Sequence, residues 1–406
     1  MSLQYIELNF TEQLSVLQQR GVLKGKEQII TGIEPAHNGF GPRYTLADAG
    51  GRLFLRLNAN GYLGLALHPQ VIDAEKAAAE LFGCGPGAVR FISGTYAIHT
   101  ELETALAEFH GREAGMLFSS AYAAVTGILP QLISRDTLVI SDSLNHNCII
   151  NGIRLAQPTA KAIYPHLDMD ELANLLHTNQ RVYQRVVVVT DGIFSMRGDH
   201  APLDAIAALC RKYESSYKEG IITVVDDSHG VGAFGKTGRG TEEYTGARAD
   251  LYIATLGKAL GVNGGYAVSS KKVIDFFRET SPFYIYSNPI TPAEAAAAMA
   301  ALSILNSDEG ITLLEKTRTL SARLRQGLAD IGIETISGEH PIVPLLVRDT
   351  QKTAAMVDYL FERNVLATGL NYPVVPKGEE EIRLQVTASH TAKDIEYLLR
   401  ILADFS

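Results

Sequence analysis

A lysine and an aspartate each follow a short apolar run, and together they could perform chemistry on a carbonyl compound. Lys258 comes after the run at residues 250–255, and Asp226 ends the run at residues 221–226. A lysine amine forms a Schiff base with an aldehyde. A carboxylate can hold a pyridine nitrogen in its protonated form. This pair is therefore what chemistry with pyridoxal 5'-phosphate (PLP) requires.

Simpler interpretations of these two residues have to be weighed. Most lysines are solvated surface residues, but the glycines at positions 257, 261, 264 and 265 would let the backbone approach a ligand closely. Two acids followed by His229 could suggest a metal site. No further cluster with metal-ligand spacing occurs in the sequence, so no metal is predicted. In the PLP interpretation, His229 could reach the ring hydroxyl, because it lies three residues after Asp226.

Other polar positions could complete such a site. His146 follows the apolar run at residues 137–141 and could stack on a flat ring and assist proton transfer. Residues 118–124 have the pattern of a strand, a small polar turn and a helix, which is typical of phosphate cradles. Thr255 and Ser287 could add hydroxyl groups. Each feature also has an ordinary alternative, namely a packed histidine, a common serine turn or a structural hydroxyl.

Arg383 lies in the short predicted strand at residues 381–385 of the small domain. An arginine beside a strand is often only a surface charge. Its guanidinium can also bind a carboxylate through two parallel hydrogen bonds, and an amino-acid substrate offers such a carboxylate. Arg383 is therefore a candidate for substrate binding.

The apolar runs themselves predict the fold. Residues 137–141, 185–190, 221–226 and 250–255 are continuously apolar, as expected for strands buried on both faces. Helical patterns such as residues 203–217 lie between them, which indicates an α/β fold with a mostly parallel sheet flanked by helices. Ligands gather at the carboxyl ends of such strands. The polar residues Ser141, Asp191, Asp226 and Thr255 fall at those ends.

We expect three segments along the chain. Residues 1–57 form an N-terminal helix at 10–21 and a hairpin at 42–57 with its turn at 48–51, and residues 58–290 form the large PLP-binding domain. Residues 291–406 begin with a helix through residue 305, capped by Thr291 and Glu294. A smaller α+β C-terminal domain follows, with helices near 311–331, 353–363 and 391–403 and strands near 342–347 and 381–385.

Composition and charge indicate which partners and which compartment to expect. The chain has 406 residues and a net charge of −9 without a basic block, which argues against nucleic acid as a partner. Its three cysteines are widely spaced, which suits a reducing compartment. The sequence shows neither a secretory signal nor an apolar run of about 20 residues, so we expect a cytoplasmic protein that does not span a membrane.

These residues, with their neighbours, resemble the α-oxoamine synthases among the fold-type I PLP-dependent transferases, and most of all the 2-amino-3-ketobutyrate CoA ligase branch. The resemblance extends from about residue 10 to the C-terminal region. Any one of its motifs is common, but their combination is specific. The matching segments are residues 62–65, 90–95, 99–103, 145–146, 190–196, 225–230, 255–261 and 372–378.

The resemblance implies a role for each candidate residue. Lys258 would be the Schiff-base lysine, His146 would stack on the cofactor ring, and Asp226 would pair with its nitrogen. His229 and Ser195 would approach the ring hydroxyl, Ala121 and Tyr122 would lie near the ring and phosphate, and Thr255 would bind the phosphate. Ser287 would reach the phosphate of the neighbouring subunit, which implies a homodimer with shared sites. Asn60 and Arg383 would hold the amino-acid carboxylate.

The implied reaction condenses an amino-acid carbanion with an acyl-CoA thioester to an α-amino ketone, with or without loss of CO₂. Three stretches depart from the family pattern: residues 83–90, Gly61 and residues 261–265. We expect them near the substrate entrance and away from Lys258. These changes are compatible with the use of PLP, but they do not identify the electrophile that the carbanion attacks. The alternative is a PLP-dependent enzyme of specialised metabolism that joins an amino acid, with or without a γ-substituent, to an electrophile other than a CoA thioester.

Overall fold

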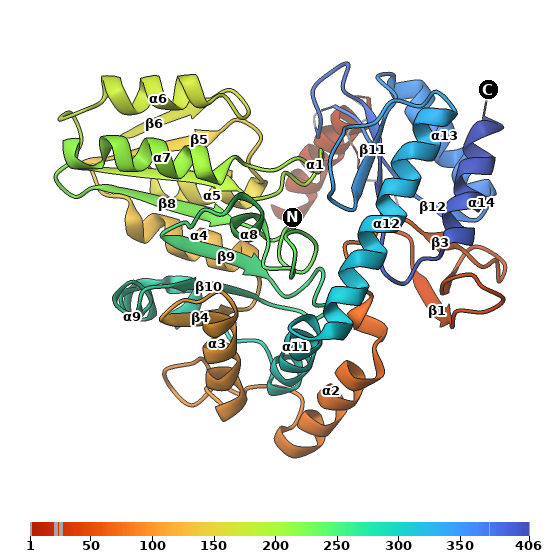
Figure 1. Ribbon diagram of the computed structural model, residues 1–406, viewed down its shortest axis with the longest axis horizontal. Coiled ribbons are helices and arrows are strands. Elements are labelled where there is room, and N and C mark those ends of the chain that lie inside the picture. The colour runs from red at the N-terminus through yellow and green to blue at the C-terminus, as the bar shows by residue number, and fades with distance from the viewer. Residues whose placement is uncertain (1, 20–22, 24–26, 373, 406) are drawn as a thin grey trace.

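A seven-stranded sheet forms the centre of the larger part of the computed structural model, which describes residues 2–19, 23, 27–372 and 374–405 (Figure 1). The strand order is β4-β10-β9-β8-β7-β5-β6. The neighbours from β9 to β6 pair in parallel, whereas β10 is antiparallel to both β4 and β9. The predicted mostly parallel sheet is thus confirmed. Its strands are β4 (Ala114–Phe118), β5 (Thr137–Asp142), β6 (Ala160–Tyr164), β7 (Arg185–Asp191), β8 (Ile221–Asp226), β9 (Leu251–Thr255) and β10 (Gly265–Ser269).

Helices bury both faces of this sheet, which explains the continuously apolar strands. In β7, Val186 and Val188 belong to one apolar cluster and Val187 and Val189 to the other, because successive side chains of a strand point to opposite faces. The first cluster includes residues of α3 (Ala97–Phe109), α6 (Met169–Thr178), α7 (Leu203–Tyr213) and α11 (Pro292–Leu305). The second includes residues of α4 (Ala121–Leu132), α5 (Asn147–Ala156), α9 (Lys271–Thr280) and α10 (Pro282–Ile285).

Helix α11 begins where the sequence predicts. Thr291 Oγ1 accepts a hydrogen bond from the backbone N–H of Glu294 at 3.0 Å, and the Glu294 carboxylate accepts one from the N–H of Thr291 at 2.7 Å. This reciprocal pair satisfies two N–H groups that the first turn leaves without partners. The helix packs against α2 (Pro69–Phe82) and α3. The remaining short helices of this part are η1 (Leu65–Leu67), η2 (Glu214–Ser216) and α8 (Thr241–Thr245).

A smaller antiparallel sheet, with strand order β11-β14-β13, forms the C-terminal part. Its strands are β11 (Ile342–Leu346), β13 (Thr368–Leu370) and β14 (Glu381–Gln385), and its helices are α12 (Asp308–Asp330), α13 (Thr350–Glu362) and α14 (Ala392–Ala403). Leu55 and Leu57 of the N-terminal segment join this core. Strand β3 (Leu55–Arg56) also pairs in parallel with β12 (Val365–Leu366). The boundaries at residues 57/58 and 290/291 stay predictions.

The N-terminal segment differs in part from expectation. Helix α1 (Ser2–Gln19) starts earlier than the predicted helix at 10–21, of which positions 20 and 21 lie outside the described residues. Strand β2 (Arg43–Leu46) pairs with β1 (Ile30–Glu34), which the sequence analysis missed. Only one bridge, Tyr44 to Phe54, links the two arms of the predicted hairpin, because β3 pairs with β12 instead. Within the described ranges, no helix is long and apolar enough to cross a membrane.

Candidate active site

The carboxyl ends of β7, β8 and β9 bring the predicted polar residues together. Asp191 and Asp226 end adjacent parallel strands and are partners in register, and Thr255 ends the next strand. A cavity of about 260 Å³ lies at this edge. It is lined by every predicted cofactor residue except Ser287. The lining residues are Ser120, Ala121, Tyr122, His146, Cys148, Asp191, Ile193, Ser195, Asp226, Ser228, His229, Thr255 and Lys258.

Lys258 lies in this cavity and is partly buried. Within the described part of the chain, its Nζ forms no hydrogen bond or ion pair. Burial lowers the pKa of the Lys258 amine, and the charge of Asp226 opposes this shift. A lowered pKa increases the fraction of free amine, which is the form that attacks an aldehyde. Lys258 also lines a second cavity, of about 530 Å³, together with Asn60.

Two residues that the sequence analysis missed hold the Asp226 carboxylate. Ser228 donates to Oδ1 from its N–H at 3.1 Å and from its hydroxyl at 2.5 Å. Cys148 donates from Sγ to Oδ2 at 3.3 Å. Burial and the charges of Asp226 and Asp191 raise the pKa of the Cys148 thiol, so it stays protonated and remains a donor. The carboxylate is thereby fixed at the wall of the cavity.

Asp191 positions His146 through the backbone. The His146 N–H donates to Asp191 Oδ2 at 2.7 Å, and the Asp191 N–H donates to Asn145 Oδ1 at 2.8 Å. His146 caps α5, where its Nδ1 accepts from the N–H of Cys148 at 3.2 Å. Burial lowers the pKa of His146, so the ring is neutral with its hydrogen on Nε2. Asp191 was noted in the sequence only as an acid at the end of a strand.

Tyr62 fixes His229 through a direct contact with its ring. Tyr62 Oη lies 2.8 Å from His229 Nδ1. Burial raises the pKa of Tyr62 and lowers that of His229, so the phenol keeps its proton and donates a hydrogen bond to Nδ1. The remaining hydrogen of His229 is then on Nε2. The sequence showed Tyr62 only as part of a family motif, and no local pattern connects it with His229.

The start of α4 forms the other end of the cavity. Ser120 Oγ accepts from the N–H of Ala123 at 3.0 Å, while the N–H groups of the first helical residues have no acceptor within the helix. Strand β10 passes beside them so closely that a Cβ on Gly265 would lie 2.1 Å from Ala121 N. Thr255 lines the cavity, but its hydroxyl donates to Gly264 O and accepts from Gly257 N, each at 3.0 Å.

The two predicted substrate residues contact each other. Arg383 Nη2 donates to Asn60 Oδ1 at 3.0 Å, which connects β14 with the loop before η1. Gly61 and residues 261–263 line the 530 Å³ cavity beside Lys258. Their expected location away from the lysine is therefore wrong. The reason is that the turn after Lys258 doubles back, with Gly261 N donating to Lys258 O at 3.0 Å, and packs on the loop at Ala66.

Asp227 does not line the cofactor cavity, unlike its neighbour Asp226. Its carboxylate accepts from the N–H of Thr241 at 2.6 Å, from Thr241 Oγ1 at 2.8 Å and from the Tyr252 hydroxyl.

Across the described residues, no group of three or more histidine, cysteine, aspartate or glutamate side chains is placed to hold a metal ion. Ser287 follows α10, is partly exposed, and does not line the cavity of its own chain.

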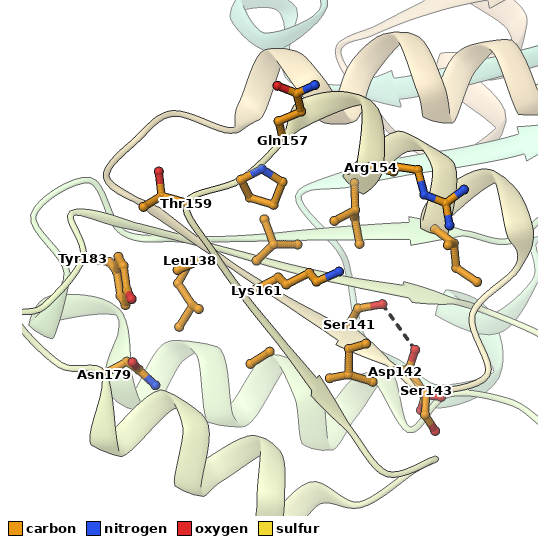
Figure 2. Close-up of a pocket in the computed structure, with 17 residues that line it drawn as sticks. Leu138, Ser141, Asp142, Ser143, Arg154, Gln157, Thr159, Lys161, Asn179 and Tyr183 are labelled. Carbon is orange, nitrogen blue, oxygen red and sulfur yellow. Dashed lines mark hydrogen bonds between the residues drawn. The ribbon is translucent and has the colours of Figure 1, made fainter.

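Another cavity, of about 790 Å³, lies beside edge strand β6 (Figure 2). Arg154, Gln157 and Lys161 are among its lining residues, and Ser141 donates to Asp142 O within it. Ser141, one of the polar residues predicted at strand ends, lines it, whereas none of the residues predicted to bind cofactor or substrate does. The candidate chemistry is therefore confined to the carboxyl edge of the sheet.

Comparison with known proteins shows the family of the chain. Residues 53–402 match the family "Aminotransferase class I and II". The chain belongs to this family. It is 37% identical over 397 residues to 8-amino-7-oxononanoate synthase of Geobacter metallireducens, with 97% of each chain covered. It is also 37% identical over 399 residues to human mitochondrial 2-amino-3-ketobutyrate coenzyme A ligase, with 95% of this chain and 91% of the relative covered.

Solved structures show the same fold. A serine palmitoyltransferase of Sphingomonas wittichii superimposes with a TM-score of 0.87 at 27% identity, covering 99% of this chain and 97% of that one. A variant serine palmitoyltransferase of S. paucimobilis, solved with PLP and myriocin, gives a TM-score of 0.85 at 26% identity. The protein is therefore a PLP-dependent enzyme of the α-oxoamine synthase group with the fold-type I architecture. The amine of Lys258, the carboxylate of Asp226 and the helix start at Ala121 line one cavity and fit this cofactor.

Proposed function

We propose that the protein joins the α-carbon of an amino acid to the acyl carbon of an acyl-CoA thioester, giving an α-amino ketone and a free thiol. The observation that carries this proposal is the place of Lys258, which lines both the cofactor cavity and the adjoining cavity that contains Asn60. A base in that position faces cofactor and substrate together. Two relatives that are 37% identical to this chain are named 8-amino-7-oxononanoate synthase and 2-amino-3-ketobutyrate coenzyme A ligase.

The residues around the cofactor cavity have separate roles in this proposal. When bound, PLP supplies an aldehyde carbon and a ring that accepts electrons from the substrate carbon. Lys258 would hold the cofactor through its amine and, once free, would remove the α-proton. Asp226 would keep the ring nitrogen protonated, and His146 would stack on the ring. His229 and Ser195 would donate to the ring hydroxyl, and the N–H groups at the start of α4, with Tyr122 and Thr255 nearby, would bind the phosphate.

Arg383 and Asn60 bind the amino-acid carboxylate in this scheme. Their contact at 3.0 Å places the Arg383 guanidinium beside the amide of Asn60, which lines the cavity next to Lys258. A guanidinium binds a carboxylate through two charge-assisted hydrogen bonds, which also fixes the direction of the substrate. The Cα–H bond then breaks toward Lys258, the new C–C bond forms at the acyl carbon, the C–S bond breaks, and the thiolate leaves and takes up a proton.

Thiol release tests the proposed reaction. Protein loaded with PLP is expected to release free thiol from acetyl-CoA or a longer acyl-CoA when glycine, alanine or serine is present, and little without the amino acid. A colorimetric thiol assay measures the release, and mass spectrometry detects the α-amino ketone. Exchange of the α-hydrogen in deuterated water without thiol release from any thioester would contradict the proposal.

We further propose a homodimer in which Ser287 completes the phosphate site of the partner subunit. Ser287 does not line the cofactor cavity of its own chain. Its neighbour Tyr286 is 75% exposed, although a large aromatic side chain is usually covered in a folded protein. A second copy that covers this segment would bury Tyr286 and bring a hydroxyl to the other site.

Mixed dimers distinguish a shared site from a separate one. The Ser287→Ala protein is expected to bind PLP about tenfold more weakly, because one hydrogen bond to a charged phosphate is lost. In a dimer of one Ser287→Ala chain and one Lys258→Ala chain, the site with the intact lysine receives the intact Ser287 of the other chain. Fluorescence titration should then show normal PLP affinity at that site. Weak binding there would show that Ser287 serves its own chain, and a monomer in sedimentation would exclude sharing.

A further inference from the structure

Glu381 lies on the same face of β14 as the substrate residue Arg383. In this strand, Ile382 and Leu384 belong to the core of the small domain, so the alternate residues Glu381 and Arg383 point to the opposite face. Residues two apart on one face of a strand are separated by roughly 7 Å. Because Arg383 contacts Asn60 at the cavity beside Lys258, the face that carries Glu381 is turned toward the active site.

The Glu381 carboxyl is buried and unpartnered. Its relative exposure is 3%, and its Oε1 has no hydrogen-bond partner. Burial raises the pKa of Glu381 to about 8, although the charges of Arg383 and Arg197 lower it, and the charges of Glu379 and Asp199 add to the rise. At neutral pH the side chain is thus mostly a neutral carboxylic acid, with one hydrogen to donate.

Glu381 lines a cavity of about 1080 Å³ that adjoins the cofactor cavity. Ser195 is a lining residue of both. This volume is at the upper end of the range for pockets that hold drug-sized ligands, and is far larger than a small amino acid needs. Apolar side chains form part of the wall, including Leu144, Ile150 and Val374.

The other charged residues of this cavity already have partners. Arg197 pairs with Asp199 at 2.8 Å and with Glu379 at 3.7 Å. Arg348 pairs with Glu334 through both of its terminal nitrogens. Of the charged residues that line the cavity, Glu381 is the one without a hydrogen bond or ion pair among the described residues. A ligand in the cavity would therefore meet one free hydrogen-bond donor beside apolar surface.

We propose that this cavity holds the carrier arm of the acyl donor, and that the Glu381 carboxyl donates a hydrogen bond to an amide carbonyl of that arm. The inference rests on the proposed acyl transfer. A neutral acid suits an amide carbonyl, whereas a cationic ligand would need the ionised form. The donor is thus an acyl thioester of an amide-bearing thiol. Coenzyme A and a carrier protein present the same arm, and their other parts distinguish them.

Two substitutions at Glu381 separate the hydrogen bond from the shape of the side chain. Glu381→Leu is expected to raise the KM for acetyl-CoA about tenfold, because the arm loses its donor. Glu381→Gln keeps a neutral donor and is expected to stay within about threefold of the wild type. Neither change should alter the KM for the amino acid. Arg383→Lys is the matched comparison, since it should raise the KM for the amino acid and leave that for acetyl-CoA unchanged.

The pH profile provides a readout that a purely structural role would not change. Glu381 is neutral below about pH 8 and ionises above it, so donation to the arm is lost as the pH rises. The wild-type KM for acetyl-CoA should therefore increase above about pH 8. The Glu381→Gln protein should lack this increase, because its amide does not ionise.

The choice of thioester and a binding measurement complete the test. Glu381→Leu should raise the KM for an N-acetylcysteamine thioester, which has one amide, by the same factor as for acetyl-CoA. It should not change the KM for an ethyl thioester, which has no amide. Equal activity with N-acetylcysteamine and CoA thioesters would indicate that the nucleotide is not needed, as with a carrier protein. This inference alone would be overturned if the Glu381→Leu protein released thiol with unchanged KM values and bound coenzyme A with unchanged calorimetric affinity. Absence of both thiol release and coenzyme A binding in the wild type would overturn the proposed function as well.

Discussion

Replacing Lys258 with alanine is expected to abolish covalent attachment of the cofactor and to lower kcat at least about a thousandfold. The partly buried amine has no hydrogen-bond or ion-pair partner within the described residues, and its lowered pKa increases the fraction of free base. The substitution removes both the nucleophile for the aldehyde and the base for the α-proton. Borohydride reduction followed by peptide mass spectrometry should find a phosphopyridoxyl group on Lys258 in the wild type and on no lysine in the variant.

Lys271→Ala provides the matched control for this experiment. Lys271 is an exposed lysine at the start of α9 that pairs with Asp275 at 2.6 Å. Its loss should leave cofactor attachment and kcat within about twofold of the wild type, because exposed ion pairs contribute little. A reduced adduct on another lysine in the Lys258→Ala protein would show that the site has been assigned to the wrong amine.

Asp226→Asn is expected to lower kcat by about 10² to 10³, the range typical for loss of one preorganised electrostatic partner. An amide of the same shape cannot hold the pyridine nitrogen protonated, so the ring becomes a weaker electron acceptor. Ser228 can still donate to the remaining oxygen, and the fold should persist. The measurement is kcat together with the visible spectrum of the bound cofactor, which reports the protonation of the ring.

The neighbouring substitution Asp227→Asn should have the opposite profile. Asp227 accepts hydrogen bonds from Thr241 and Tyr252 and does not line the cofactor cavity. Replacing an accepting oxygen with an NH₂ group is expected to reduce the free energy of unfolding by about 1–3 kcal/mol, as measured by chemical denaturation. Equal effects of both substitutions on kcat and on stability would contradict the separate roles of these adjacent acids.

The pattern of the strands was sufficient to predict β5, β7, β8 and β9 of the main sheet, but not β6 or the antiparallel β10. Continuous apolar runs such as residues 185–190 indicate burial on both faces, and parallel strands place their carboxyl ends along one edge. Lys258, Asp226, His146 and Thr255 could therefore be assigned to one site from local sequence. The pairing of β3 with β12 could not be predicted, because it joins Leu55 to Val365 across most of the chain.

The sequence by itself determined the cofactor chemistry, because that depends on residue types at strand ends. Only the tertiary structure decided which other side chains orient these strand-end residues. Tyr62 reaches His229, Cys148 reaches Asp226, and the turn after Lys258 folds back beside Gly61. These contacts join segments that no short sequence period connects. They depend on how the loops pack, and packing also decides that Glu381 is buried beside a cavity while its neighbour Ile382 lies in the core.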